Sequence, residues 1–245
     1  MIHRLAALVF GLSVFAIGAP PVADTVPAPL VQVQTSEHVN FAPGGTIHLK
    51  NSSGNLTVEG WDQNEVEVTV VRSMGYDSEP ASLATQHLDG VHIVTGQPSG
   101  NEMEISTNRA ACPNRFTHPL DKCRDVVLEY RIKAPRNSRL VIAHAGGYVS
   151  VTGMTGNIEA TNHRGDIVLM LPDLAKYSIE ARTKIGVVTS DIAGATRSKH
   201  LFGENFTHGD ASLPRRLSLQ MGFGGITIKE LPTEVIAPAA TTPGN

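Results

Sequence analysis

Apolar and polar residues alternate along most of the chain, which is the period of a strand with one buried face. In EVEVTVV, Val66, Val68 and Val70 fall on one face, and acidic or hydroxyl side chains fall on the other. The segment DVVLEYRIKAP alternates in the same way until Pro135. Only the segment from Glu79 to His87 has a helical pattern. The alternation therefore predicts an all-β protein.

Glycine recurs every nine residues in GGYVSVTGMTGNIEATNHRGDIVLML, at Gly147, Gly156 and Gly165. Each is followed by apolar or small residues two and four positions later, which share one face of a strand. Glycine tolerates the positive φ of a tight turn, so nine residues make one strand and one turn. The pattern recurs at Gly45, Gly54, Gly209 and Gly224, and less well at Gly186.

Two such units make a rung of about eighteen residues, and stacked rungs bury a continuous core. The fold class predicted from this count is a β-solenoid, a β-helix-like stack of short strands that each begin with glycine. A β-sandwich of hairpins has the same alternation and is the alternative. The solenoid is favoured because hairpins do not require a fixed count of nine.

The N-terminal segment is typical of an export signal. Arg4 precedes fifteen uncharged residues, Leu5 to Ala19, which are fewer than the roughly 20 that a membrane-spanning helix needs. We therefore expect a cleaved signal peptide over residues 1–23 and no membrane span in the mature chain. The remaining expected divisions are a linker (24–38), a β-strand-repeat domain (39–231) and a disordered tail rich in proline, alanine and threonine (232–245).

Charge excludes one class of partner. The 245 residues carry 20 basic and 23 acidic side chains, with no basic stripe or tail, so nucleic acid is not expected as a ligand.

The motifs of common hydrolases, phosphate-binding loops and zinc peptidases are absent from the sequence. A calcium β-roll would need an aspartate in each glycine-led turn, and of the three units only Gly165 is followed directly by an acid, Asp166. His144 and His163 are expected at exposed strand ends, without a third metal ligand. Trp61 is expected to cap the N-terminal part of the core or to pack in the turn before the Val66 strand, and an aromatic that stacks on a ligand is the alternative. We predict no catalytic residue, metal or cofactor.

Cys112 and Cys123 flank the loop CPNRFTHPLDKC. In an exported protein, an isolated pair at this spacing is most simply a disulfide. A redox or metal pair would need a closer spacing or further ligands, and the sequence shows neither.

The glycine-led segments also resemble a known family. GGTIHLKNSSGNLTVEGWDQNEVEVTVVRS and the stretch from Val126 to Leu171 are similar to the bacterial β-strand-repeat family named "putative adhesin". The similarity covers roughly residues 40 to 230 and includes the Gly-Trp-Asp turn at Gly60–Asp62. It implies an exported or envelope-associated β-solenoid with no catalytic residues to transfer.

Together these features predict a non-enzymatic adhesin or envelope scaffold, located in the periplasm, in the cell envelope or outside the cell. Its expected partner is a surface polymer or an envelope protein. The candidate contacts are polar residues expected on the outer face of the rungs: Thr152, Asn157, Glu159, Asn162, His163 and Arg164. The alternatives are a polysaccharide-active β-helix enzyme, which needs converging carboxylates, and a structural subunit that self-assembles through its ends.

The predicted Cys112–Cys123 disulfide can be tested by reduction. Closing so short a loop should stabilise the mature protein by about 3 kcal/mol, because the cross-link restricts the unfolded chain. Urea unfolding of intact and reduced protein measures this difference, and mass spectrometry after alkylation shows whether the bond exists. Two freely alkylated thiols in unreduced protein would contradict the prediction.

Overall fold

The computed structural model describes residues 29–51, 53–76, 80–109, 125–199 and 202–232. The predicted signal peptide, Cys112, Cys123 and nearly all of the predicted tail lie outside these residues, so they remain predictions.

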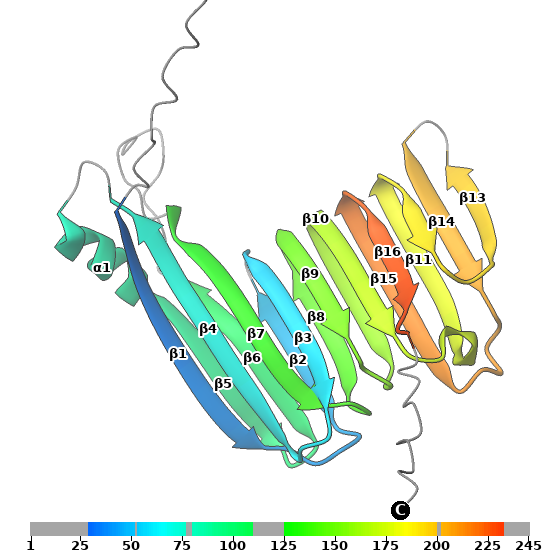
Figure 1. The fold of residues 1–245 in the computed structure, drawn as a ribbon, viewed down its shortest axis with the longest axis horizontal. Coiled ribbons are helices and arrows are strands. Elements are labelled where there is room, and N and C mark those ends of the chain that lie inside the picture. The colour runs from blue at the N-terminus through cyan, green and yellow to red at the C-terminus, as the bar shows by residue number, and fades with distance from the viewer. Residues whose placement is uncertain (1–28, 52, 77–79, 110–124, 200–201, 233–245) are drawn as a thin grey trace, which may run out of the picture.

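Strands make up most of the described chain (Figure 1). Those of the first half are β1 (Leu30–Asn40), β2 (Thr46–Asn51), β3 (Asn55–Trp61), β4 (Glu65–Gly75), β5 (Val91–Ser99), β6 (Glu102–Arg109), β7 (Val127–Pro135) and β8 (Arg139–His144). Those of the second half are β9 (Gly147–Thr152), β10 (Ile158–Leu171), β11 (Tyr177–Ile185), β12 (Val188–Ser190), β13 (Ala195–Lys199), β14 (Gly203–His208), β15 (Arg215–Phe223) and β16 (Ile226–Glu230). The helix α1 spans Ala81–Asp89, and a 3-10 turn spans Leu174–Lys176.

These strands form one mixed, strongly curled sheet whose two layers face each other. The two layers are called sheet A and sheet B below. Sheet A runs in the order β1-β4-β7-β3-β9-β10-β16-β12. Sheet B runs in the order β5-β6-β2-β8-β10-β15-β11-β14-β13. The long strand β10 belongs to both layers: its first half pairs in sheet B and its second half in sheet A.

The centre of the molecule is a stack of strand pairs, each with one strand in sheet B followed by one in sheet A. Along the stack the pairs are β2–β3, β8–β9, the two halves of β10, β15–β16 and β11–β12, and neighbouring strands run parallel. Gly165 pairs with Gly147, at the offset of eighteen positions that the nine-residue repeat predicts. The stacking order departs from chain order at one place, because β15–β16 lies between β10 and β11–β12.

The turn from sheet B to sheet A carries a glycine with positive φ in every pair. Their φ values are 128°, 122°, 109°, 134° and 139° for Gly54, Gly147, Gly165, Gly224 and Gly186, in stacking order. From Gly147 onward, the Cα of each packs against the carbonyl of the glycine before it: a Cβ on Gly147 would lie 1.9 Å from the Gly54 oxygen, and one on Gly165 would lie 2.1 Å from the Gly147 oxygen. At Gly54, the first of the series, the nearest atom is the Leu128 carbonyl oxygen of β7. Any side chain at these positions would therefore collide with a backbone carbonyl oxygen, and it would also disfavour the positive φ that the turn requires.

The core fills the space between the two layers. Apolar residues of alternate positions meet in rows across the strands, such as the fully buried Ile47, Leu140, Ile158 and Leu217 of sheet B. Aliphatic side chains make up most of this core, because layered strands pack well with branched residues, and Tyr130, Tyr177 and Phe41 are its largest fully buried members.

Antiparallel strands close both ends of the stack. At the end nearest the N-terminus, β1 and β4 extend sheet A, β5 extends sheet B, and α1 packs between them through buried Ala84 and Leu88. The helix predicted from Glu79 to His87 is thus confirmed, beginning at Ala81. No helix of the described residues has the length and apolar character needed to cross a membrane.

Other expectations are adjusted by the structure. The strand β1 begins at Leu30, within the segment expected to be a linker, and pairs along its whole length with β4. Gly156 does not have positive φ, and its neighbour is the Ser138 carbonyl, 2.1 Å from a Cβ placed on it. It lies in the return from sheet A to sheet B, so only alternate glycines of the nine-residue series form the stacked turns.

The stacked turns can be tested with Gly165→Ala. The added Cβ meets the Gly147 carbonyl at 2.1 Å, and the positive φ disfavours any side chain, so the free energy of unfolding should fall by at least about 2 kcal/mol. Gly96→Ala in β5 is the control, since nothing lies within 4 Å of a Cβ there. Urea unfolding compares the two, and equal stability of both variants would contradict this account.

Candidate functional site

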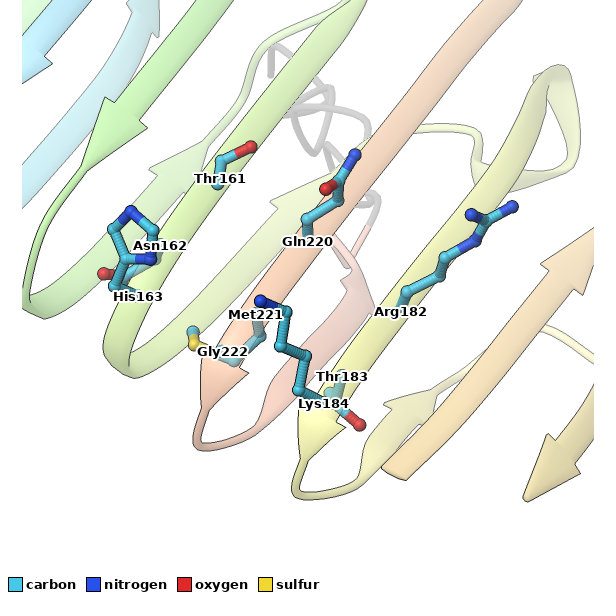
Figure 2. Close-up of a pocket in the computed structure, with 9 residues that line it drawn as sticks. All are labelled: Thr161, Asn162, His163, Arg182, Thr183, Lys184, Gln220, Met221 and Gly222. Atoms are coloured by element: carbon cyan, nitrogen blue, oxygen red, sulfur yellow. The ribbon is translucent and has the colours of Figure 1, made fainter. Parts of the chain in front are cut away.

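A hollow of about 410 Å³ opens on the outer face of sheet B, where β10, β15 and β11 approach their turns (Figure 2). Its walls and floor come from three strands that are far apart in sequence but neighbours in the sheet: Thr161, Asn162, His163, Arg182, Thr183, Lys184, Gln220, Met221 and Gly222.

Strand register determines which of these side chains face outward. Thr161 pairs with Gln220, which pairs with Arg182, so these three form one row across neighbouring strands. Two positions further along the same three strands, Gly222 lies between His163 and Lys184 (Figure 2). A Cβ on Gly222 would lie 2.4 Å from the His163 carbonyl oxygen. The missing side chain leaves the space between the imidazole and the ammonium group.

The lining is basic. Arg182 forms an ion pair with Glu180 on the same strand. Within the described residues, Lys184 takes part in no ion pair, and no carboxylate is among the residues that line the hollow. Guanidinium, ammonium, amide and hydroxyl groups are all donors, so the hollow suits an anionic group with several oxygen atoms.

The buried polar side chains behind the hollow bind the turns of the stack. Asn162 Nδ2 donates to the Gly147 carbonyl at 2.9 Å, and Thr183 Oγ1 donates to the Gly186 carbonyl at 2.9 Å. His144 Nε2, in register with Asn162, lies 2.8 Å from the Gly54 carbonyl oxygen. These contacts satisfy turn carbonyls that would otherwise be buried without a partner.

The six predicted outer-face residues do not form one surface. Thr152 lies on sheet A, whereas Asn157, Glu159, His163 and Arg164 are exposed on sheet B or at its turn. The expectation for Asn162 was wrong: it is 1 % exposed, because its position alternates inward with Ile158 and Ala160. His144 is likewise 2 % exposed and not at an exposed strand end.

Two of the predicted residues have structural partners. The Asn157 Oδ1 atom accepts a hydrogen bond from the backbone N–H of Arg216 at 2.8 Å, and Glu159 lies 3.5 Å from Arg139. Of the six predicted residues, Asn162 and His163 line the hollow, and of these two His163 is exposed.

Sequence reasoning missed Arg182, Lys184 and Gln220. They come from β11 and β15, and they meet β10 only because β15 inserts between the two strands. Their alternation with Ala181, Thr183 and Leu219 marks them as outward residues, but nothing local indicates that they are neighbours of His163.

The acidic residues do not build a catalytic arrangement in the hollow. Glu159 and Glu180 occupy one row on either side of Ser218, and each is paired with an arginine of its own. No group of three or more potential metal ligands comes together within the described parts of the chain.

Comparisons with known proteins give distant matches only. No protein-family model matches the chain, and no curated protein sequence matches it. A solved structure of a "putative cell adhesion protein" from Clostridium sporogenes aligns at 12 % identity and a TM-score of 0.45, covering 82 % of this chain and all of that one.

Two further solved structures are of proteins named "putative adhesin". The one from Bacteroides fragilis aligns at 11 % identity and a TM-score of 0.24, covering 80 % of this chain and 97 % of that one. The one from Parabacteroides merdae aligns at 8 % identity and a TM-score of 0.25, covering 81 % and 96 %. At this distance, function has to be argued from the site.

Burial lowers the pKa of His144 below its ordinary value of 6.5, and the hydrogen bond to the Gly54 carbonyl opposes this shift. A histidine with a lowered pKa favours the folded state when it is neutral. Its contribution is therefore present above pH 6.5 and is lost as the pH falls through the lowered value.

We expect the free energy of unfolding to decrease between pH 7.5 and 5.5, and His144→Asn to remove part of that decrease. Asparagine already occupies the paired position at Asn162, so it should fit the turn. His163→Asn, at the exposed neighbouring site, is the control. Urea unfolding at a series of pH values gives the slopes, and a His144→Asn slope equal to the unmodified protein's would refute this role of burial.

Proposed function

We propose that this chain is an exported, non-enzymatic binding protein of the cell envelope that holds an anionic surface polymer against the outer face of sheet B. The observation that carries this proposal is the hollow with Arg182, Lys184 and His163 and with no carboxylate among the described residues that line it. Anionic oxygen atoms would meet donors on two sides of the gap over Gly222.

A row of polar side chains extends the hollow across the sheet. Arg182 pairs in register with Asn205 of β14, and Asn205 pairs with Arg197 of β13. With Thr161 and Gln220, this row crosses five strands at the sheet spacing of about 4.8 Å. A track of this kind suits an extended chain with repeated acidic groups better than one small molecule.

We further infer that the stack is a short, two-layered β-solenoid. Five in-register strand pairs, each with a glycine turn at the same place, support this description over a sandwich of hairpins. The antiparallel ends act as caps on the stack, as terminal units do in repeat proteins.

The two alternatives have less support. A glycoside hydrolase uses a pair of carboxyl groups at the bound chain, whereas Glu159 and Glu180 are each paired with arginine. Self-assembly through the β12 edge is opposed by Glu204, whose Oε2 accepts the backbone N–H of Val188 at 2.7 Å and occupies that donor.

Binding of the mature chain to a polyuronate, measured by calorimetry with a neutral glucan for comparison, tests the proposal. Lys184→Glu should weaken polyuronate binding by about tenfold or more, because it removes a charge-assisted contact and adds repulsion. Lys229→Glu changes net charge equally but lies on the outer face of sheet A, so it should have little effect.

If polyuronate affinity falls equally in Lys184→Glu and Lys229→Glu, the loss is explained by net charge alone, and this would contradict a site on sheet B. Equal affinity for the neutral glucan would contradict the anionic ligand.

A further inference from the structure

A second hollow, of about 230 Å³, lies at the opposite edge of the stack from the glycine turns. The end of β3, the turn into β4 and the segment after β7 surround it, and it contains Trp61, the single tryptophan of the chain. The sequence predicted that Trp61 packs in this turn, and the turn position is confirmed. The ring is nevertheless only partly buried, and it borders an open space.

Two contacts hold the indole ring in place. Its Nε1 donates to the Glu65 carbonyl across the turn at 2.9 Å, and the Lys133 ammonium lies 5.5 Å from the ring centroid. In the sheet, Trp61 pairs with Pro135, which also lines the hollow. A rigid aromatic surface beside proline costs little entropy when a ligand stacks on it.

Polar groups with fixed positions face the same space. The Arg136 guanidinium bonds the Asp62 carboxylate through Nε at 2.7 Å and through Nη2 at 3.4 Å, and its Nη1 donates to the Gly153 carbonyl. The Asp62 side chain is nevertheless 80 % exposed, so its oxygen atoms can accept further hydrogen bonds.

Side-chain amides complete the rim. Asn137 uses its Oδ1 to accept the backbone N–H of Gly44 at 3.0 Å, which leaves its NH₂ group to donate to a ligand. Asn64 lies in the turn and is exposed. Because Asp62 and Arg136 cancel each other's charge, this rim offers paired donors and acceptors without a net charge.

We propose that this hollow binds one neutral pyranose ring of a glycan. The apolar C–H face of the sugar stacks on Trp61 beside Pro135, and its hydroxyl groups, which both donate and accept, bond Asp62, Arg136 and the Asn137 amide. This site is separate from the basic hollow on sheet B and does not depend on the function proposed for it. Its ligand class differs as well, because no unpaired charge lines it to select an acid.

The single tryptophan makes intrinsic fluorescence a reporter for this site alone. The folded full-length mature chain is titrated with glucose, galactose, mannose and N-acetylglucosamine, and with sorbitol as an open-chain polyol that has no ring face. At least one pyranose should change the emission saturably, with a Kd of about 1 mM, because a small ligand in a shallow site gains little. Sorbitol should not.

Asp62→Asn should weaken this binding by about tenfold while leaving the fold intact, since the side chain is largely exposed. Asp89→Asn, at an exposed position of α1 outside this hollow, removes the same charge, so it is the matched control and should leave sugar binding unchanged. Circular dichroism confirms that both variants are folded.

Three results would overturn the proposal. The first is no saturable change in emission with any of the four sugars up to about 100 mM, a concentration far above the expected Kd. The second is the same response to sorbitol, and the third is unchanged affinity in folded Asp62→Asn. None of them bears on polyuronate binding at sheet B.

Discussion

The structure depends on a close approach of backbone to backbone at one corner of the stack. Five successive turns pass from sheet B to sheet A, and at the four that follow the first a glycine Cα packs against the carbonyl of the turn before it. No other residue fits there, because the chain has positive φ and the space for a Cβ is already occupied by an oxygen atom. The stacked turns fix the strand register of both sheets at once, because the two strands of each pair extend in opposite directions from the same glycine turn.

Register in turn decides the character of both surfaces. Inward positions meet as aliphatic rows between the layers, and outward positions meet as polar rows across neighbouring strands. The basic hollow exists because one outward position, Gly222, has no side chain between His163 and Lys184. The polar residues inside the corner, His144, Asn162 and Thr183, belong to the same scheme, since each bonds a turn carbonyl that the core would otherwise leave unsatisfied.

The stack of strand pairs is terminated differently at its two ends. At one end, antiparallel strands and α1 cover the space between the layers, and Arg72 ties the helix to the sheet through the carbonyls of Leu88 and Val91. At the other end, β14 and β13 extend sheet B, while Glu204 occupies a backbone donor of the short edge strand β12. The Glu204 contact hinders the addition of a further strand at the β12 edge, which is the hazard of any open sheet.

The sequence by itself determined the strands, the helix and the eighteen-residue offset between Gly147 and Gly165, because alternation and glycine turns are local properties of the chain. It also placed Trp61 in its turn. It did not show that Asn162 and His144 are buried, since a polar side chain that bonds a turn carbonyl looks like any other polar residue in a strand.

Only the tertiary structure decided that β15–β16 inserts between β10 and β11–β12, and this insertion brings Arg182, Lys184 and Gln220 beside His163. The same is true of Arg136, which only the tertiary structure brings to Asp62 and Trp61. Parallel neighbours are joined through long connections, so which strands lie side by side depends on the packing of the whole stack and not on any short stretch of sequence.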